Sequence, residues 1–128
     1  MHDQRAQFLL ELTGRYFADK EVRQFYYRLE NNKFFFNPET FPESDDERCL
    51  DQLIYTFDVI GWAVRTGSIS ISEAQIFAFQ AVKVLENLEV TKYLLDLDDH
   101  YKKDRRPTPA HGDAKFFVAT LNAGHFNS

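Results

Sequence analysis

The sequence predicts an all-α fold, a compact bundle of about five helices around a central antiparallel helical hairpin, with a short C-terminal helix after a proline-containing linker. Three observations predict this class. Apolar residues recur at spacings of three and four along most of the chain, which is the period of an amphipathic helix. Capping residues precede several of these segments. Outside one loop, no run alternates apolar and polar residues as a half-buried strand does.

The central hairpin is predicted over residues 44–88. Ser44 is followed three residues later by Glu47, a spacing at which side chains and backbone N–H groups cap a helix start. The helix is expected to run to Thr66 and to end at Gly67. Its apolar positions share one face: Leu50, Leu53, Ile54, Phe57, Gly61 and Val64. The segment 76–88 is apolar on more than half of its circumference, so we expect it to lie between other elements.

Amphipathic helices are also predicted on both sides of the hairpin. The first is indicated by Phe8, Leu9, Leu12 and Tyr16, with Gly14 as a candidate bend or early end because glycine weakens a helix interior. Asp19 is the expected N-cap of the second helix, whose apolar face is formed by Val22, Phe25, Tyr26 and Leu29. A helix after the hairpin is indicated by one stripe of Val90, Tyr93, Leu94, Leu97 and Tyr101.

The chain divides into a helical domain over residues 1–104, a linker over 105–113 and a short C-terminal helix with a tail over 114–128. Pro107 and Pro109 favour an extended linker. Asp113 is the expected cap of the last helix, which ends before Gly124. We expect this helix to belong to the same domain, docked on its body or on a neighbouring chain.

A loop with four phenylalanines follows the second helix. Pro38 and Pro42 exclude regular helix here, and Phe34, Phe35, Phe36 and Phe41 carry more apolar area than a solvated loop can leave in water. We expect the loop to pack on the core. The alternative is that Phe34, Phe35 and Phe36 form an exposed patch that binds a partner.

The flank of the central helix carries the most suggestive polar pattern. Asp51, Asp58 and Arg65 share one row at spacings of seven, and Tyr55 and Trp62 form the adjacent row. This pattern fits a ligand cleft with aromatic walls, or a partner-binding strip anchored by Trp62. The interpretation we favour is structural, with the two aromatic residues as secondary core and the charges solvated beside them.

Composition excludes several function classes. The net charge of −5 disfavours a nucleic-acid partner, since phosphate binding depends on Lys and Arg. No apolar run approaches the ~20 residues of a membrane span. Cys49 is the one cysteine, which fits a cytoplasmic location, and at the start of a buried helix we expect it to be inert. Asp96 and His100 have the spacing of two metal ligands, but two ligands make no site, so no metal or other cofactor is expected.

One resemblance concerns the middle half of the chain. The run from Arg48 through Cys49, Leu50, Asp51, Gln52, Leu53 and Ile54, continuing through Phe57, Ile60, Gly67 and Ile69 to Phe77 and Phe79, resembles a bacterial helical family known only as a domain of unknown function. The resemblance implies a helical fold and a bacterial or phage origin. It supplies no catalytic residue.

The sequence favours a cytosolic protein-interaction module, with self-association or an acidic inhibitor of the immunity type as narrower versions. Seven acidic residues against one basic residue over 39–58 are suited to a basic partner. The alternative is a small-molecule-binding protein or an enzyme that uses the acidic and aromatic cleft. A non-enzymatic role is the prediction.

Overall fold

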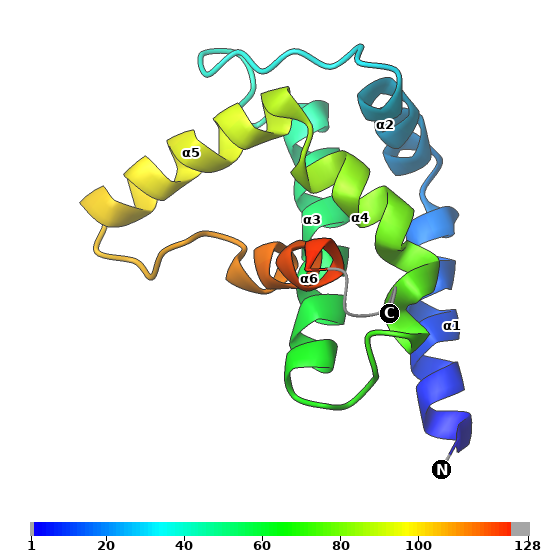
Figure 1. Cartoon of the computed structure of the whole chain (residues 1–128). Helices are drawn as coiled ribbons and strands as arrows, with labels where there is room; N and C mark the ends of the chain where they lie inside the picture. Colours follow the sequence, from blue (N-terminus) through cyan, green and yellow to red (C-terminus); the bar gives the residue numbers. More distant parts are fainter. Residues whose placement is uncertain (1, 124–128) are drawn as a thin grey trace.

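The computed structural model describes residues 2–123 and is all-α, as predicted. Within that range there are six α-helices, one 3-10 helix and no strand. The α-helices are α1 (His2–Ala18), α2 (Lys20–Glu30), α3 (Asp45–Arg65), α4 (Ala78–Leu85), α5 (Leu88–Lys103) and α6 (Gly112–Asn122), and the 3-10 helix η1 (Glu73–Phe77) precedes α4. Figure 1 shows α3 as a central rod with the other helices arranged around it.

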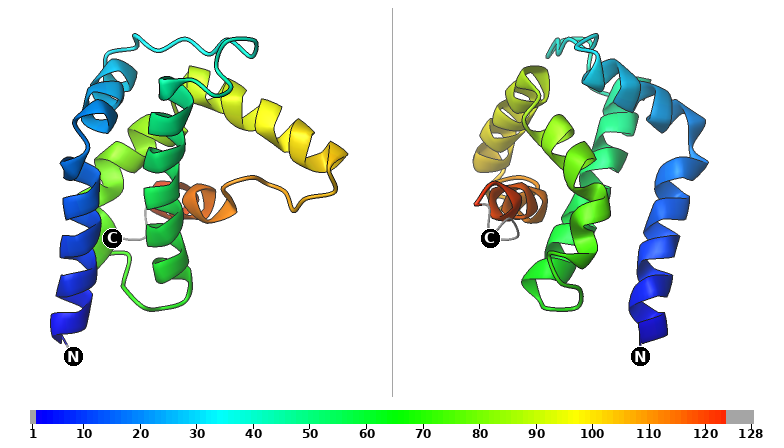
Figure 2. Two further views of the ribbon diagram at one scale, coloured as in Figure 1. Left: turned by 180° about the vertical axis from the view of Figure 1, so that it is seen from behind. Right: turned by 45° about the vertical axis from the view of Figure 1, so that its right-hand side comes forward.

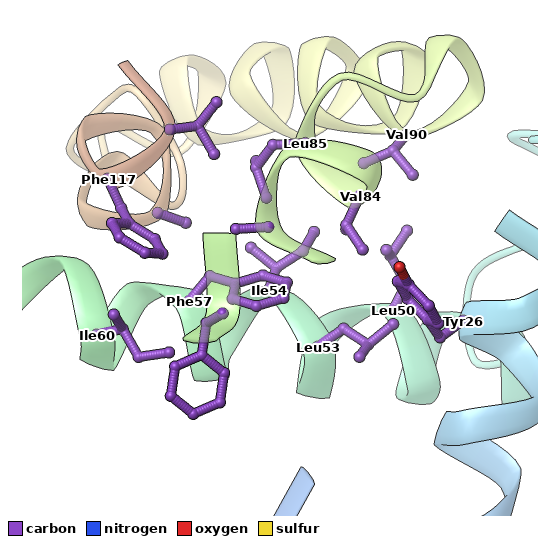
Figure 3. Close-up of a cluster of buried hydrophobic side chains, with 14 of the residues drawn as sticks. Tyr26, Leu50, Leu53, Ile54, Phe57, Ile60, Val84, Leu85, Val90 and Phe117 are labelled. Atoms are coloured by element: carbon purple, nitrogen blue, oxygen red, sulfur yellow. The ribbon is translucent and has the colours of Figure 1, made fainter. Parts of the chain in front are cut away.

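The predicted central helix is confirmed as α3. The Ser44 hydroxyl accepts a hydrogen bond from the backbone N–H of Glu47, so Ser44 is the N-cap. The Glu47 carboxylate turns back to the N–H of Glu43, one residue before the cap. One side of α3 is fully buried, and Leu53, Ile54 and Phe57 are among the side chains of the core shown in Figure 3.

The segment after Gly67 is organised differently from the predicted helix over 76–88. A reciprocal capping box between Ser70 and Glu73 starts η1 and not an α-helix. The α-helix begins only at Ala78, and Leu88 already belongs to α5, because the Asn87 side chain caps that helix. The chain does turn back beside α3, and α4 lies obliquely against it (Figures 1 and 2).

The principal neighbour of α3 is α6, which shares a larger contact with α3 than any other described helix does. Ala114 and Phe117 of α6 are fully buried against it. Gly61 makes the approach possible, because a Cβ there would lie 2.0 Å from the carbonyl oxygen of Asp113. The C-terminal helix is therefore docked on the chain's own body. Its predicted end at Gly124 lies outside the described residues.

The two N-terminal helices cover one side of the body. Gly14 does not end the first of them, since α1 continues to Ala18. Asp19 caps α2 as predicted, accepting the backbone N–H groups of Glu21 and Val22. The Tyr16 side chain, predicted on the apolar face of the first helix, is outside what the structure describes.

The phenylalanine loop packs on the core through two of its three consecutive rings. Phe34 is buried with its centroid 5.1 Å from that of Phe25, and half-buried Phe36 lies against Phe41 and Tyr93. Phe35 is 76% exposed. An exposed patch of all three residues is therefore wrong, because successive residues of an extended segment point to opposite sides.

The C-terminal half of α5 projects from the body, and the segment 104–111 returns to α3, where α6 begins (Figures 1 and 2). Helix α5 holds this returning segment in place through Asp98. The Asp98 carboxylate accepts the N–H of Ala110 at 2.6 Å and pairs with Lys115 of α6. None of the helices between residues 2 and 123 combines the length and apolar character required to cross a membrane.

Candidate functional site

The row of Asp51, Asp58 and Arg65 on α3 contacts neighbouring elements of the chain and does not line an open cleft. The Asp51 carboxylate accepts a hydrogen bond of 2.6 Å from the hydroxyl of Tyr93 on α5. Burial raises the pKa of Asp51, and the hydrogen bond from Tyr93 opposes part of this change. Burial and the carboxylate also raise the pKa of Tyr93 far above its ordinary value, so the hydroxyl keeps its proton. This pair ties α3 to α5.

The next two members of the row hold the start of α6. Asp58 accepts a hydrogen bond from the backbone N–H of Ala114 at 2.8 Å and lies 2.6 Å from Nδ1 of His111. Arg65 pairs with Asp113 at 2.9 Å. The carboxylates of Asp51 and Asp58 are thus engaged within the chain, as an interhelical polar seam.

The aromatic row is exposed, contrary to the expectation that it forms secondary core. The side chains of Tyr55 and Trp62 are 61% and 50% exposed. At helical spacing they lie on the side of α3 that faces away from its fully buried residues. The structure thus separates the predicted acidic-aromatic site into a partly buried polar seam and an exposed aromatic strip.

Trp62 also lines an open groove of about 610 Å³ between α1 and the C-terminal end of α3. Its lining also includes the apolar residues Phe8, Ala63 and Ile69, and Arg5, which is paired with Glu73. Helix α1 has only small contacts with α2 and α3, which leaves the groove open beside it. We call Tyr55, Trp62 and this groove the Trp62 surface.

The other chemistry-bearing residues offer less. Burial raises the pKa of the Cys49 thiol, although the nearby Arg48 lowers it, so the thiol is a poor nucleophile. His100 lies 3.4 Å from Asp96, but Asp98 is directed to Ala110 and Lys115. In the described part of the chain, no three His, Cys, Asp or Glu side chains are grouped as a metal site requires.

Sequence reasoning missed two contributors. The contact between His111 and Asp58 was not predicted, because the two residues are 53 positions apart in the sequence. No local sequence pattern indicates that a histidine in a linker faces a charged residue on a distant helix. Phe8 was assigned to the apolar face of the first helix, and it lines the groove because α1 packs loosely there.

No family model matches the chain, and no curated protein or solved structure is significantly similar to it. The interpretation of the Trp62 surface therefore depends on its own geometry.

Proposed function

We propose that the protein is an interaction module that binds another protein through the Trp62 surface. The observation that carries the proposal is a half-exposed tryptophan on the central helix that borders an apolar groove. Tryptophan and tyrosine are the residues most often found as anchors of protein interfaces, because they bury large areas at low entropic cost.

The groove suits the apolar face of an amphipathic segment. Its lining includes the apolar residues Phe8, Ala63 and Ile69, and the charged Arg5 in this lining is already paired, so the occupant gains contact area more than ion pairs. The net charge of −5 favours a partner with basic residues around its apolar anchor, which is consistent with an inhibitor that masks a basic surface.

The small-molecule or enzymatic alternative draws less support from the arrangement. It needs Asp51 and Asp58 to converge with the aromatic residues on one cavity. Both carboxylates are instead directed to Tyr93 and to the start of α6.

Site-specific photo-crosslinking tests the proposal. A photoreactive phenylalanine derivative is placed at position 62, and in a matched control at Tyr27, an equally exposed aromatic residue on α2. In cells that produce the protein we expect one discrete adduct from position 62 and none from position 27. Excess wild-type protein should prevent the adduct and Trp62→Ala protein should not. Equal capture from both positions, or none from position 62, would contradict the proposal.

A further inference from the structure

The outward face of α5 carries an apolar stripe that nothing in the described chain covers. Leu88 and Leu95 are 78% and 62% exposed. At spacings of four, three and four, Leu88, Lys92, Leu95 and Asp99 fall on one line along the helix, opposite the buried Val90 and Leu94. Two exposed leucines one heptad apart on a projecting helix are typical of a helix-packing surface.

The charges along this stripe are complementary to those of a second copy of the stripe that runs in the opposite direction. Lys92 precedes Leu95 by three residues and Asp99 follows it by four. If two copies of α5 cross antiparallel with their Leu95 side chains at the twofold axis, Lys92 of each copy lies opposite Asp99 of the other. Asp99 is exposed and makes no ion pair within the described residues, whereas Lys92 contacts only Glu89 of the preceding turn.

A groove beside the stripe offers room for a side chain from the second copy. It encloses about 300 Å³ between α5 and α6, and its apolar wall includes Leu94, Leu95 and Val118. The charged group at its rim, Lys115, is already paired with Asp98. An apolar side chain therefore enters this groove without breaking a polar contact.

We propose that the protein forms a homodimer in which the α5 helices pack antiparallel and Leu95 of each copy enters the other copy's groove between α5 and α6. A second copy fits better than an unrelated protein because one stripe supplies both charges of each interchain pair. A twofold interface uses the same patch on both subunits and requires this self-complementarity. The dimer surface shares no residue with the Trp62 surface.

Sedimentation velocity over a concentration series tests the dimer. We expect wild-type protein to shift from monomer to dimer and Leu95→Asp to weaken dimerisation by at least about tenfold, because a buried unpaired carboxylate opposes association. Leu10→Asp is the matched control, an equally exposed leucine on α1, and should dimerise like wild type. Circular dichroism confirms that each variant is folded. A monomeric wild type, an unaffected Leu95→Asp, or equal losses in both variants would overturn the proposal.

Charge exchange tests the antiparallel arrangement. Lys92→Asp and Asp99→Lys should each weaken dimerisation by about tenfold, because each creates two like-charge contacts per dimer. An equimolar mixture of the two variants should dimerise again, since an acidic stripe then faces a basic one. The double variant Lys92→Asp with Asp99→Lys should dimerise like wild type, because antiparallel packing pairs the exchanged charges. Failure of the double variant to dimerise would overturn the arrangement.

Discussion

The carboxylate of Asp58 on α3 lies 2.6 Å from Nδ1 of His111 at the start of α6, and its second oxygen accepts the backbone N–H of Ala114. His111 is the N-cap residue of α6, with a left-handed φ of 56°, and its own side chain caps no N–H group of the helix. Free N–H groups and the positive end of a helix dipole favour a negatively charged partner. Asp58 therefore caps α6 from another helix.

Replacing Asp58 should destabilise the fold. We expect Asp58→Ala to lower the free energy of unfolding by about 2–3 kcal/mol, since a half-buried N–H group and an imidazole lose their partner. Asp58→Asn should lose less, because its amide oxygen still accepts the N–H of Ala114. Urea unfolding followed by circular dichroism measures both, with the exposed loop variant Glu39→Ala as the control. Equal stability of Asp58→Ala and Glu39→Ala would contradict this role.

Gly61 should be intolerant of any side chain. A Cβ at position 61 would lie 2.0 Å from the carbonyl oxygen of Asp113, and backbone atoms cannot move aside as a flexible side chain can. We expect Gly61→Ala to lower the free energy of unfolding by about 1–3 kcal/mol and to increase amide exchange in α6.

Gly14→Ala is the matched control for Gly61→Ala. Beyond the adjacent residues and the backbone of the helix itself, no described atom lies within 4 Å of a Cβ there, and the residue is inside α1. The substitution should raise the free energy of unfolding by about 0.5–1 kcal/mol, since alanine favours a helix interior. A similar effect at both glycines would show that α6 does not need the close approach.

The features that the sequence predicts well depend on contacts between residues that are close together in the chain. Asp19 and Ser44 are caps in the structure because a side-chain oxygen and an N–H two or three residues later meet without help from the rest of the fold. The capping box of Ser70 and Glu73 shows the limit of such local signals. The capping box forms, but it specifies only the first turn, and that turn continues as a 3-10 helix.

The place where α6 docks could not be predicted, because its causes are distant in sequence. Gly61 was recognised as part of an apolar stripe, but the backbone that needs its missing side chain belongs to Asp113. The row of Asp58 and Arg65 was recognised from its spacing, and periodicity does not say which segment faces a row. Tyr55 and Trp62 were expected in the core for the same reason, since their exposure depends on where α1 and α5 lie.

The phenylalanine loop offers a test of burial at adjacent residues. Phe34 is almost fully buried between Phe25 and Phe41, whereas the neighbouring Phe35 points to solvent. We expect Phe34→Ala to lower the free energy of unfolding by about 3–5 kcal/mol and Phe35→Ala to change it by less than about 0.5 kcal/mol. Thermal and urea unfolding compare the two variants. A large loss at Phe35 would mean that this ring is covered in the folded protein.

The buried pair of Asp51 and Tyr93 predicts a pH dependence. Burial raises the pKa of Asp51 in the folded protein, whereas in the unfolded chain an aspartate titrates near about 4. Between these two values the folded protein binds a proton that the unfolded chain has released. The free energy of unfolding that Asp51 contributes is therefore fully present below the unfolded pKa and is lost as the pH rises through the folded pKa.

Asp51→Asn should remove this dependence. The amide oxygen still accepts the Tyr93 hydroxyl, and no charge is buried, so the stability of the variant relative to wild type should increase as the pH rises from about 3 to neutrality. Tyr93→Phe should act in the opposite direction, because it leaves the ionised Asp51 without its donor. Urea unfolding of the three proteins at a series of pH values measures these differences. If Asp51→Asn differs from wild type by the same amount at every pH, the Asp51 carboxylate is not penalised by burial, and its role is limited to the hydrogen bond with Tyr93.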